Sequence, residues 1–264
     1  MESTTAPASP PPYREIRALF DDETITVYQA YSGTIASAAV AAQRLNASAA
    51  FSTTRMTWIK PSWAWMLYRA GYSHKDKGQE RILALRMKHA DFLSLLEKGV
   101  VARNHQHNSR RRRRSTDEAE TETKVGAPGG DGDAREGAAG VGTAEDSQSL
   151  QVPREGSMLP QVRIQWDPER TVRLEKLGHR SIQIGVPGGL SAHWAENLIV
   201  SIEDVTQAAR DLKKLLDERP NVSDDELVRL GLVPVERPFP VPEELQRALG
   251  MILPPPSDLD AGGG

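Results

Sequence analysis

A stretch of cations and aromatic side chains between residues 55 and 69 has the composition of a ligand site. In it the cations Arg55, Lys60 and Arg69 lie among the aromatic side chains Trp58, Trp65 and Tyr68. An arginine binds phosphate through two parallel hydrogen bonds, a lysine acts as a point charge, and an aromatic ring stacks on a flat base or a cation. The stretch therefore predicts a site for a ligand with phosphate groups and a flat base.

Amide side chains elsewhere extend this candidate site. Gln165 and Gln183 alternate with apolar residues in the segments 162–167 and 181–186, so both amides should face away from the core. There they could bind base edges or ribose hydroxyls, as could Gln29, which follows Tyr28. The predicted ligand-binding set, expected to meet largely on one concave surface, is Arg55, Lys60, Arg69, Tyr28, Gln29, Gln165 and Gln183.

A purely structural interpretation of the same residues stays open. Arg55 and Arg69 could pair with the carboxylates of Asp167 and Glu169, which follow Trp166 in the chain. The tryptophans would then belong to the core. The two interpretations differ in whether the cations face an open surface or are neutralised by carboxylates.

Several other chemistries have little or no support in the sequence. The chain contains no cysteine, which excludes disulfides, thiolate metal sites and cysteine nucleophiles. His105 and His107 have no neighbouring carboxylates, so no metal site is predicted. The glycines of 137–142 are not placed between a strand and a helix, as a phosphate loop requires. No cofactor can be named from the sequence.

The elements that must position these residues alternate between strands and helices. The periodicity predicts strands at 24–31, 81–88, 162–167 and 181–186. Helices are predicted at 35–45, from 61 to 71, at 91–98, in a long segment that begins at Ile199, near 223–231 and at 242–249. This pattern predicts an α+β fold with a mixed or antiparallel sheet and flanking helices.

A long insertion is expected to divide this domain. Residues 102–158 are rich in Gly, Ala, Ser, Glu, Asp and Arg and lack any Phe, Trp or Tyr, which predicts disorder. The two halves of the domain are then 13–101 and 159–252, because neither half has enough strands to fold alone. Residues 1–12 and 253–264 are also predicted to be disordered.

Six separated motifs resemble one protein family. They read RxIRALFDDETITVYQAY, FSTTRMTWIKPSWAWMLYRAGY, QERILAL, RIQWDPER, RSIQIGV and VPVERPFPVPEELQRALGM. In this order they are similar to the domain of unknown function 4291 family, from Tyr13 to Met251 apart from the insertion. The resemblance implies no catalytic residue, because the function of that family is unknown.

Two functions of different classes fit the sequence. The first is a protein directed at nucleotides or nucleic acids, with a phosphate site at residues 55–69. One form of it is an ADP-ribosyltransferase-like domain, in which Tyr28, the run 52–54 and Glu80 surround a nicotinamide dinucleotide. The second is a non-catalytic interaction module whose polar clusters stabilise the fold.

Charge and targeting patterns add an expected location. The formal net charge is −3, and the arginine run 110–114 is followed at once by acidic residues. Such a run can bind nucleic acid or an import receptor, or it can be a solvated segment that neutralises itself. No signal peptide or membrane-spanning apolar run is legible, so the cytoplasm or the nucleus is expected, without a membrane partner.

Overall fold

The computed structural model describes residues 11–102 and 161–252, which belong to one compact unit. Strands and helices from both ranges combine in an α+β fold, as the sequence predicts. The segments predicted to be disordered lie outside the described residues, except for residues 11, 12 and 102. The arginine run 110–114 and both histidines of 105–107 also lie outside them.

Two sheets form the centre of the fold. The first is antiparallel and has the order β2 (Thr24–Tyr31), β4 (Arg81–Lys88), β8 (Ile199–Asp204). The second has the order β3 (Thr57–Ile59), β7 (Lys176–Val186), β6 (Val162–Arg170), β5 (Gly99–Val101), and its last pair is parallel. Two backbone hydrogen bonds, of 2.7 and 3.1 Å, join Tyr28 to Lys60. The edges of the two sheets therefore meet at this pair.

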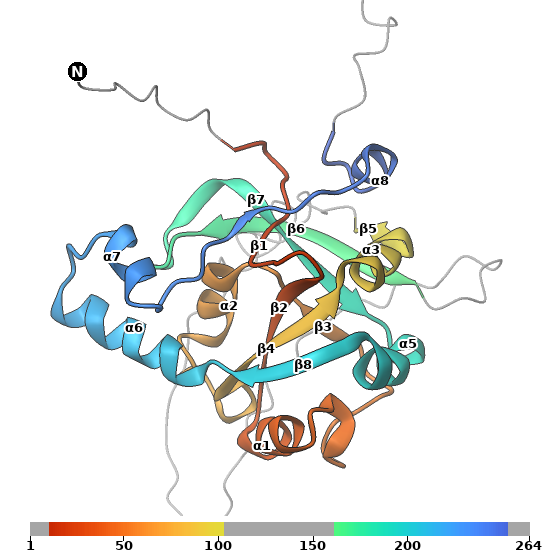
Figure 1. Cartoon of the computed structure of the whole chain (residues 1–264), viewed down its shortest axis with the longest axis horizontal. Helices are drawn as coiled ribbons and strands as arrows, with labels where there is room; N and C mark the ends of the chain where they lie inside the picture. Colours follow the sequence, from red (N-terminus) through yellow and green to blue (C-terminus); the bar gives the residue numbers. More distant parts are fainter. Residues whose placement is uncertain (1–10, 103–160, 253–264) are drawn as a thin grey trace, which may run out of the picture. The chain divides into compact units, whose positions relative to one another are not determined.

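Helices cover both faces of these sheets (Figure 1). A two-stranded ribbon of β1 (Arg17–Ala18) and β9 (Arg237–Pro238) ties the beginning of the domain to its end. The helices are α1 (Gly33–Ala42), α2 (Trp63–Ala70), α3 (His89–Glu97), α5 (Gly188–His193), α6 (Thr206–Glu218), α7 (Asp224–Arg229) and α8 (Glu243–Ala248). Short 3-10 turns η1 (Leu45–Ala47) and η2 (Lys77–Gln79) and a π-helical turn η3 (Trp194–Leu198) complete the fold.

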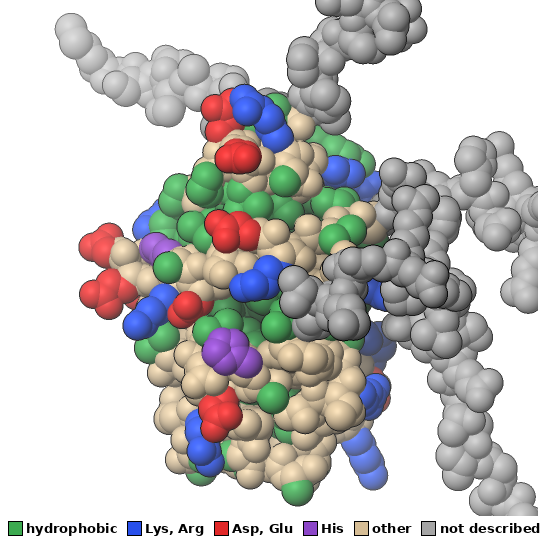
Figure 2. Space-filling view, turned by 90° about the vertical axis from the view of Figure 1, so that its right-hand side faces the viewer, with side chains coloured by type: hydrophobic (Ala, Val, Ile, Leu, Met, Phe, Trp, Pro, Cys, Tyr) green, Lys and Arg blue, Asp and Glu red, His purple; other side chains and the backbone are tan. Residues whose placement is uncertain are grey.

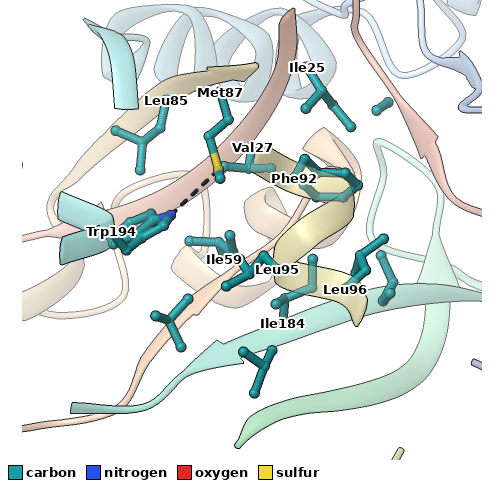
Figure 3. Close-up of a cluster of buried hydrophobic side chains, with 14 of the residues drawn as sticks. Ile25, Val27, Ile59, Leu85, Met87, Phe92, Leu95, Leu96, Ile184 and Trp194 are labelled. Carbon is teal, nitrogen blue, oxygen red and sulfur yellow. Dashed lines mark hydrogen bonds between the residues drawn. The ribbon is translucent and has the colours of Figure 1, made fainter. Parts of the chain in front are cut away.

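The main core lies between one face of the sheets and the helices α1, α3 and η3. Figure 3 shows Val27, Leu85 and Ile184 pointing from three different strands into this core. Trp194 closes it, and its indole nitrogen lies 3.5 Å from the sulfur of Met87. Because side chains alternate along a strand, the neighbours of these core residues must face the other way.

The opposite face of the first sheet carries a second core. Tyr28 and Ala84 pack there with Leu67 of α2 and Leu212 of α6. Figure 1 shows α6 and α7 together at the left, beyond the end of β8. The sheet is therefore covered on both faces along β2 and β4.

The sequence prediction is wrong for the long helix that begins at Ile199. Residues 199–204 form strand β8, which pairs with β4, and helix α6 begins only at Thr206. Ile199, Ile202 and Val205 have the spacing of a helix, but pairing of Ile202 with Leu85 in the sheet overrides this local pattern. The helix predicted at 35–45 also ends early, because Gln43 adopts a left-handed conformation with φ of 51°.

Figure 2 shows the side of the molecule that carries α3, α5 and α8, and the described residues there form no large patch of one charge sign. Acidic and basic side chains are interspersed there, while Lys and Arg side chains recur along the right-hand edge of the view. No helix within residues 11–102 and 161–252 is long and apolar enough to cross a membrane.

Candidate functional site

Strand alternation places three predicted site residues in one row on the polar face of the second sheet. Ile59 pairs with Ile184, and Ile184 pairs with Ile164, and all three are buried in the main core. The next residue on each strand must therefore face away from that core. These residues are Lys60, Gln183 and Gln165, and the amide of Gln183 donates a hydrogen bond of 2.8 Å to the oxygen of Gln165. We call this set the polar row.

Lys60 is the most unusual member of the polar row. Its side chain is buried, with 3% of the residue exposed, and its ammonium nitrogen lies 4.6 Å from the ring centroid of Trp65. Burial, reinforced by the nearby Arg69, lowers the pKa of Lys60 from 10.5 to about 7, although Asp167 opposes the change. Within the described residues Lys60 makes no ion pair. The amine is therefore poised between its neutral and charged forms near pH 7.

Asp167 supplies the acidic counterpart at the end of the polar row. It occupies the same face of β6 as Gln165, two residues away, and it pairs with Ser181 across β7. Burial raises the pKa of Asp167, while the positive charges of Lys60 and Arg180 oppose that effect. A partly buried carboxyl and a buried amine thus lie close enough to influence each other, as acid and base groups in functional sites commonly do.

Aromatic rings lie on both sides of the polar row. Trp58 and Met56 rest on Gly185, where a Cβ atom would lie 3.0 Å from the Trp58 ring and 2.9 Å from the Met56 sulfur. On α2, Tyr68 is exposed and the guanidinium of Arg170 lies 3.9 Å from its ring centroid. Arg170 is not among the site residues predicted from the sequence, although its place in the RIQWDPER motif beside Glu169 is a usable signal.

A second group of carboxyls lies at the N-terminus of α2. Ser62 caps this helix by accepting a hydrogen bond from the Trp65 N–H at 3.1 Å, and its hydroxyl donates to Glu169 at 2.9 Å. Glu236 accepts a hydrogen bond of 2.6 Å from the backbone N–H of Trp63. Burial raises the pKa of Glu236 to about 8, and the nearby Glu169 adds to this, while the bond from Trp63 opposes it.

Glu236 therefore holds its proton at neutral pH. It lies at the N-terminus of α2, the helix that begins three residues after Lys60. Glu236 is not predicted from the sequence, because it lies 176 residues beyond Lys60 in the chain. The available signal was a lone carboxyl between the apolar residues Val235 and Pro238 of the last motif.

The structure brings together only part of the predicted site. Tyr28 lies beside Lys60, but α2 covers it and its ring packs 5.1 Å from that of Trp63. Gln29 points to the opposite face, where its amide exchanges hydrogen bonds of 2.7 and 2.9 Å with the hydroxyl of Thr57. Arg55 is exposed in the loop before β3.

The structure also shows the residues of two other interpretations, the arginines that could pair with carboxylates and the Glu80 of an ADP-ribosyltransferase-like site. Neither Arg55 nor Arg69 forms an ion pair with Asp167 or Glu169 among the described residues, and both arginines are exposed. Glu80 accepts a hydrogen bond of 2.7 Å from the backbone N–H of Gly33 at the start of α1.

Comparison with known proteins identifies the family. A family model described as a domain of unknown function (DUF4291) matches residues 15–239. The chain belongs to this family. The matched range contains the whole polar row, Asp167 and Glu236, so the site lies within the family domain. No curated protein matches the chain.

No metal centre is formed by the part of the chain that the structure describes. Its histidines and carboxylates do not gather into groups of three or more that could hold an ion.

Proposed function

We propose that this protein binds a phosphate-bearing ligand of the nucleotide or nucleic-acid class on the polar row. The observation that carries the proposal is the buried amine of Lys60, which forms no ion pair with the described residues and lies near a second cation, Arg69. Burying a charged group without a partner costs several kcal/mol. A site that tolerates this cost in the free protein gains a partner for both cations when an anion binds.

The surroundings of Lys60 support the nucleotide class over a simple anion. Trp65 and Tyr68 offer aromatic rings, and the exposed Tyr68 can accept a base. The amides of Gln165 and Gln183 satisfy one hydrogen bond between them, which leaves further donors and acceptors for a ligand. Phosphate groups would lie against Lys60 and Arg69, and the base and sugar against the amides and rings.

ADP-ribosyl transfer is a narrower form of this proposal, and it has less support. It needs the carboxylate of Glu80 to face the ligand, whereas Glu80 accepts a hydrogen bond from the helix α1. We therefore propose binding at the polar row and assign no transfer reaction. In the competing view, an interaction module, the bond between Gln165 and Gln183 serves only to stabilise the sheet.

Isothermal titration calorimetry at pH 8 tests the proposal with ATP, NAD and a short RNA. At this pH most of Lys60 is neutral, since its pKa is about 7. An anion that raises this pKa must bring close to one proton into the complex. The uptake is measured from the difference in binding heat between two buffers of unequal ionisation enthalpy.

Matched variants separate the contributions of the two cations. Lys60→Met should abolish proton uptake and weaken binding, whereas Arg69→Ala should weaken binding but retain the uptake. Lys176→Met, at the exposed start of β7, is the control and should behave as the parent protein. Absence of binding by all three ligands, or binding that both variants leave unchanged, would contradict the proposal.

A further inference from the structure

A cavity on the first sheet lies apart from the polar row. It has a volume of about 390 Å³ and is formed by the strands β2, β4 and β8 together with the segment that follows α7. Most of its wall is apolar and includes Trp63, Ala84, Leu232 and Val233. We call it the apolar pocket. It is independent of the function proposed above.

The size of the apolar pocket sets it apart from a packing defect. Protein interiors contain few voids larger than one water molecule. Pockets for small organic ligands have volumes of about 300–1,000 Å³ and combine apolar walls with a few polar groups. The apolar pocket falls within this range and has this composition.

The hydroxyl of Tyr28 is available to a ligand in this pocket. Tyr28 lines the wall and is only 3% exposed. Its hydroxyl makes no hydrogen bond with any residue that the structure describes, and it is not among the buried polar atoms, so it keeps a surface open to the cavity. A ligand atom in the cavity would supply the missing hydrogen bond.

Two opposite charges lie at the same pocket, on neighbouring strands. Arg86 of β4 and Glu203 of β8 both line it and are diagonal neighbours, since Ala84 pairs with Glu203 and Arg86 with Ser201. No ion pair joins them in the described residues. Among the described residues Arg86 forms an ion pair only with the exposed Asp21, at 3.5 Å, and 49% of the Arg86 side chain is exposed.

These two charges also lie close to the Tyr28 hydroxyl. Burial raises the pKa of Tyr28, the negative charges of Glu236 and Glu203 add to the rise, and the positive charge of Arg86 opposes it. A donor, a cation and an anion therefore converge on one apolar cavity.

We propose that the apolar pocket binds a zwitterionic small molecule with an apolar body, the chemical class of an amino acid with a large aliphatic or aromatic side chain. The ligand amine lies against Glu203 and its carboxylate against Arg86. The Tyr28 hydroxyl donates a hydrogen bond to that carboxylate. The apolar body packs on Trp63, Leu232 and Val233.

Calorimetric titration of the full chain with three related compounds tests this assignment. L-phenylalanine carries both charges, 3-phenylpropionate carries only the carboxylate, and phenethylamine carries only the amine. We expect a standard amino acid with a large apolar side chain, such as L-phenylalanine, to bind more tightly than the two compounds that carry one charge. Failure of every such amino acid to bind would overturn the proposal.

Three variants then assign each charge of the ligand. Glu203→Gln should weaken L-phenylalanine and phenethylamine by about tenfold or more and leave 3-phenylpropionate unchanged, because it removes only the partner of the amine. Arg86→Gln should give the reverse pattern. Tyr28→Phe, which deletes a single hydroxyl, should weaken the two carboxylate compounds by about fivefold.

Arg163→Gln, an exposed change on β6, is the matched control and should alter none of the affinities. Glu203 and Arg86 are both exposed, so their variants should fold as the parent does. Equal loss of all three compounds in both charge variants, or no loss in any variant, would show that the charges do not recognise the ligand and would overturn the assignment.

Discussion

Replacement of Lys60 by methionine should make the folded protein more stable at pH 7. The unfolded chain holds its lysines charged up to a pKa near 10.5, whereas burial lowers the pKa of Lys60 to about 7 in the folded state. The folded protein therefore disfavours the charged amine. Methionine has a similar length, no charge and no desolvation cost, so Lys60→Met removes this disadvantage.

The size of the effect follows from the two pKa values. Each pKa unit corresponds to about 1.4 kcal/mol, so the charged amine costs the folded state about 4 kcal/mol at pH 7. Loss of the contact between the Lys60 amine and the Trp65 ring offsets about 0.5–2 kcal/mol. We expect a net gain of about 2–4 kcal/mol in the free energy of unfolding.

The pH dependence has a definite sign. Between pH 7 and pH 10.5 the unfolded chain binds more protons at Lys60 than the folded chain does, so the stability of the parent protein rises with pH through this window. Lys60→Met lacks this rise. Its advantage over the parent should therefore shrink by about 2 kcal/mol between pH 7 and pH 9.

Urea unfolding of both proteins at pH 7 and pH 9 measures these differences. Lys176→Met serves as the control, because Lys176 is exposed and the variant should follow the parent at both pH values. A loss of about 3–5 kcal/mol in Lys60→Met at pH 7 would refute the reasoning, since it would mean that Lys60 is charged and firmly paired with Asp167.

Three further predictions concern other parts of the fold. Glu236→Gln should abolish the loss of stability expected as the pH rises from 4.5 towards 8, because the folded state holds the Glu236 proton more tightly; urea unfolding across this window checks it, and an unchanged pH profile would contradict it. Ser62→Ala removes a helix cap and leaves Glu169 without its hydroxyl partner, so it should cost about 1–3 kcal/mol in the same assay, whereas a neutral result would mean that neither bond stabilises the fold. Gly99→Ala would place a Cβ atom 2.6 Å from the Leu96 carbonyl oxygen and 2.7 Å from the Ile164 side chain, so thermal unfolding should show a loss of about 1–3 kcal/mol, and a variant as stable as the parent would show that α3 and β6 can move apart.

Strand alternation predicted which side chains share a face, and this part of the site was accessible from sequence. Ile164 and Ile184 are buried as the pattern requires, and the amides of Gln165 and Gln183 meet on the other side. The same rule separates Gln29 from Tyr28, its neighbour in the chain. Both had been placed in one ligand set by their residue types, without regard to alternation.

Burial and long-range pairing could not be predicted in the same way. Lys60 is buried because α2 begins soon after Pro61 and places Trp65 on it; the sequence predicts this helix but not that it covers Lys60. Glu236 reaches α2 through β9, a strand of two residues that is too short to be recognised from its sequence. Strand β8 has the apolar spacing of a helix at Ile199 and Ile202, and its pairing with β4 is a long-range contact that this spacing does not reveal.

The pKa of Lys60, measured with and without a ligand, tests the central claim most directly. In protein labelled with 13C and 15N at lysine, the Lys60 signals are assigned by their absence from Lys60→Met, and their shifts are followed from pH 5 to pH 11. We predict a pKa near 7 in the free protein and a clear rise with saturating ATP or RNA. A pKa near 10.5 in the free protein, or one that neither ligand changes, would contradict the account.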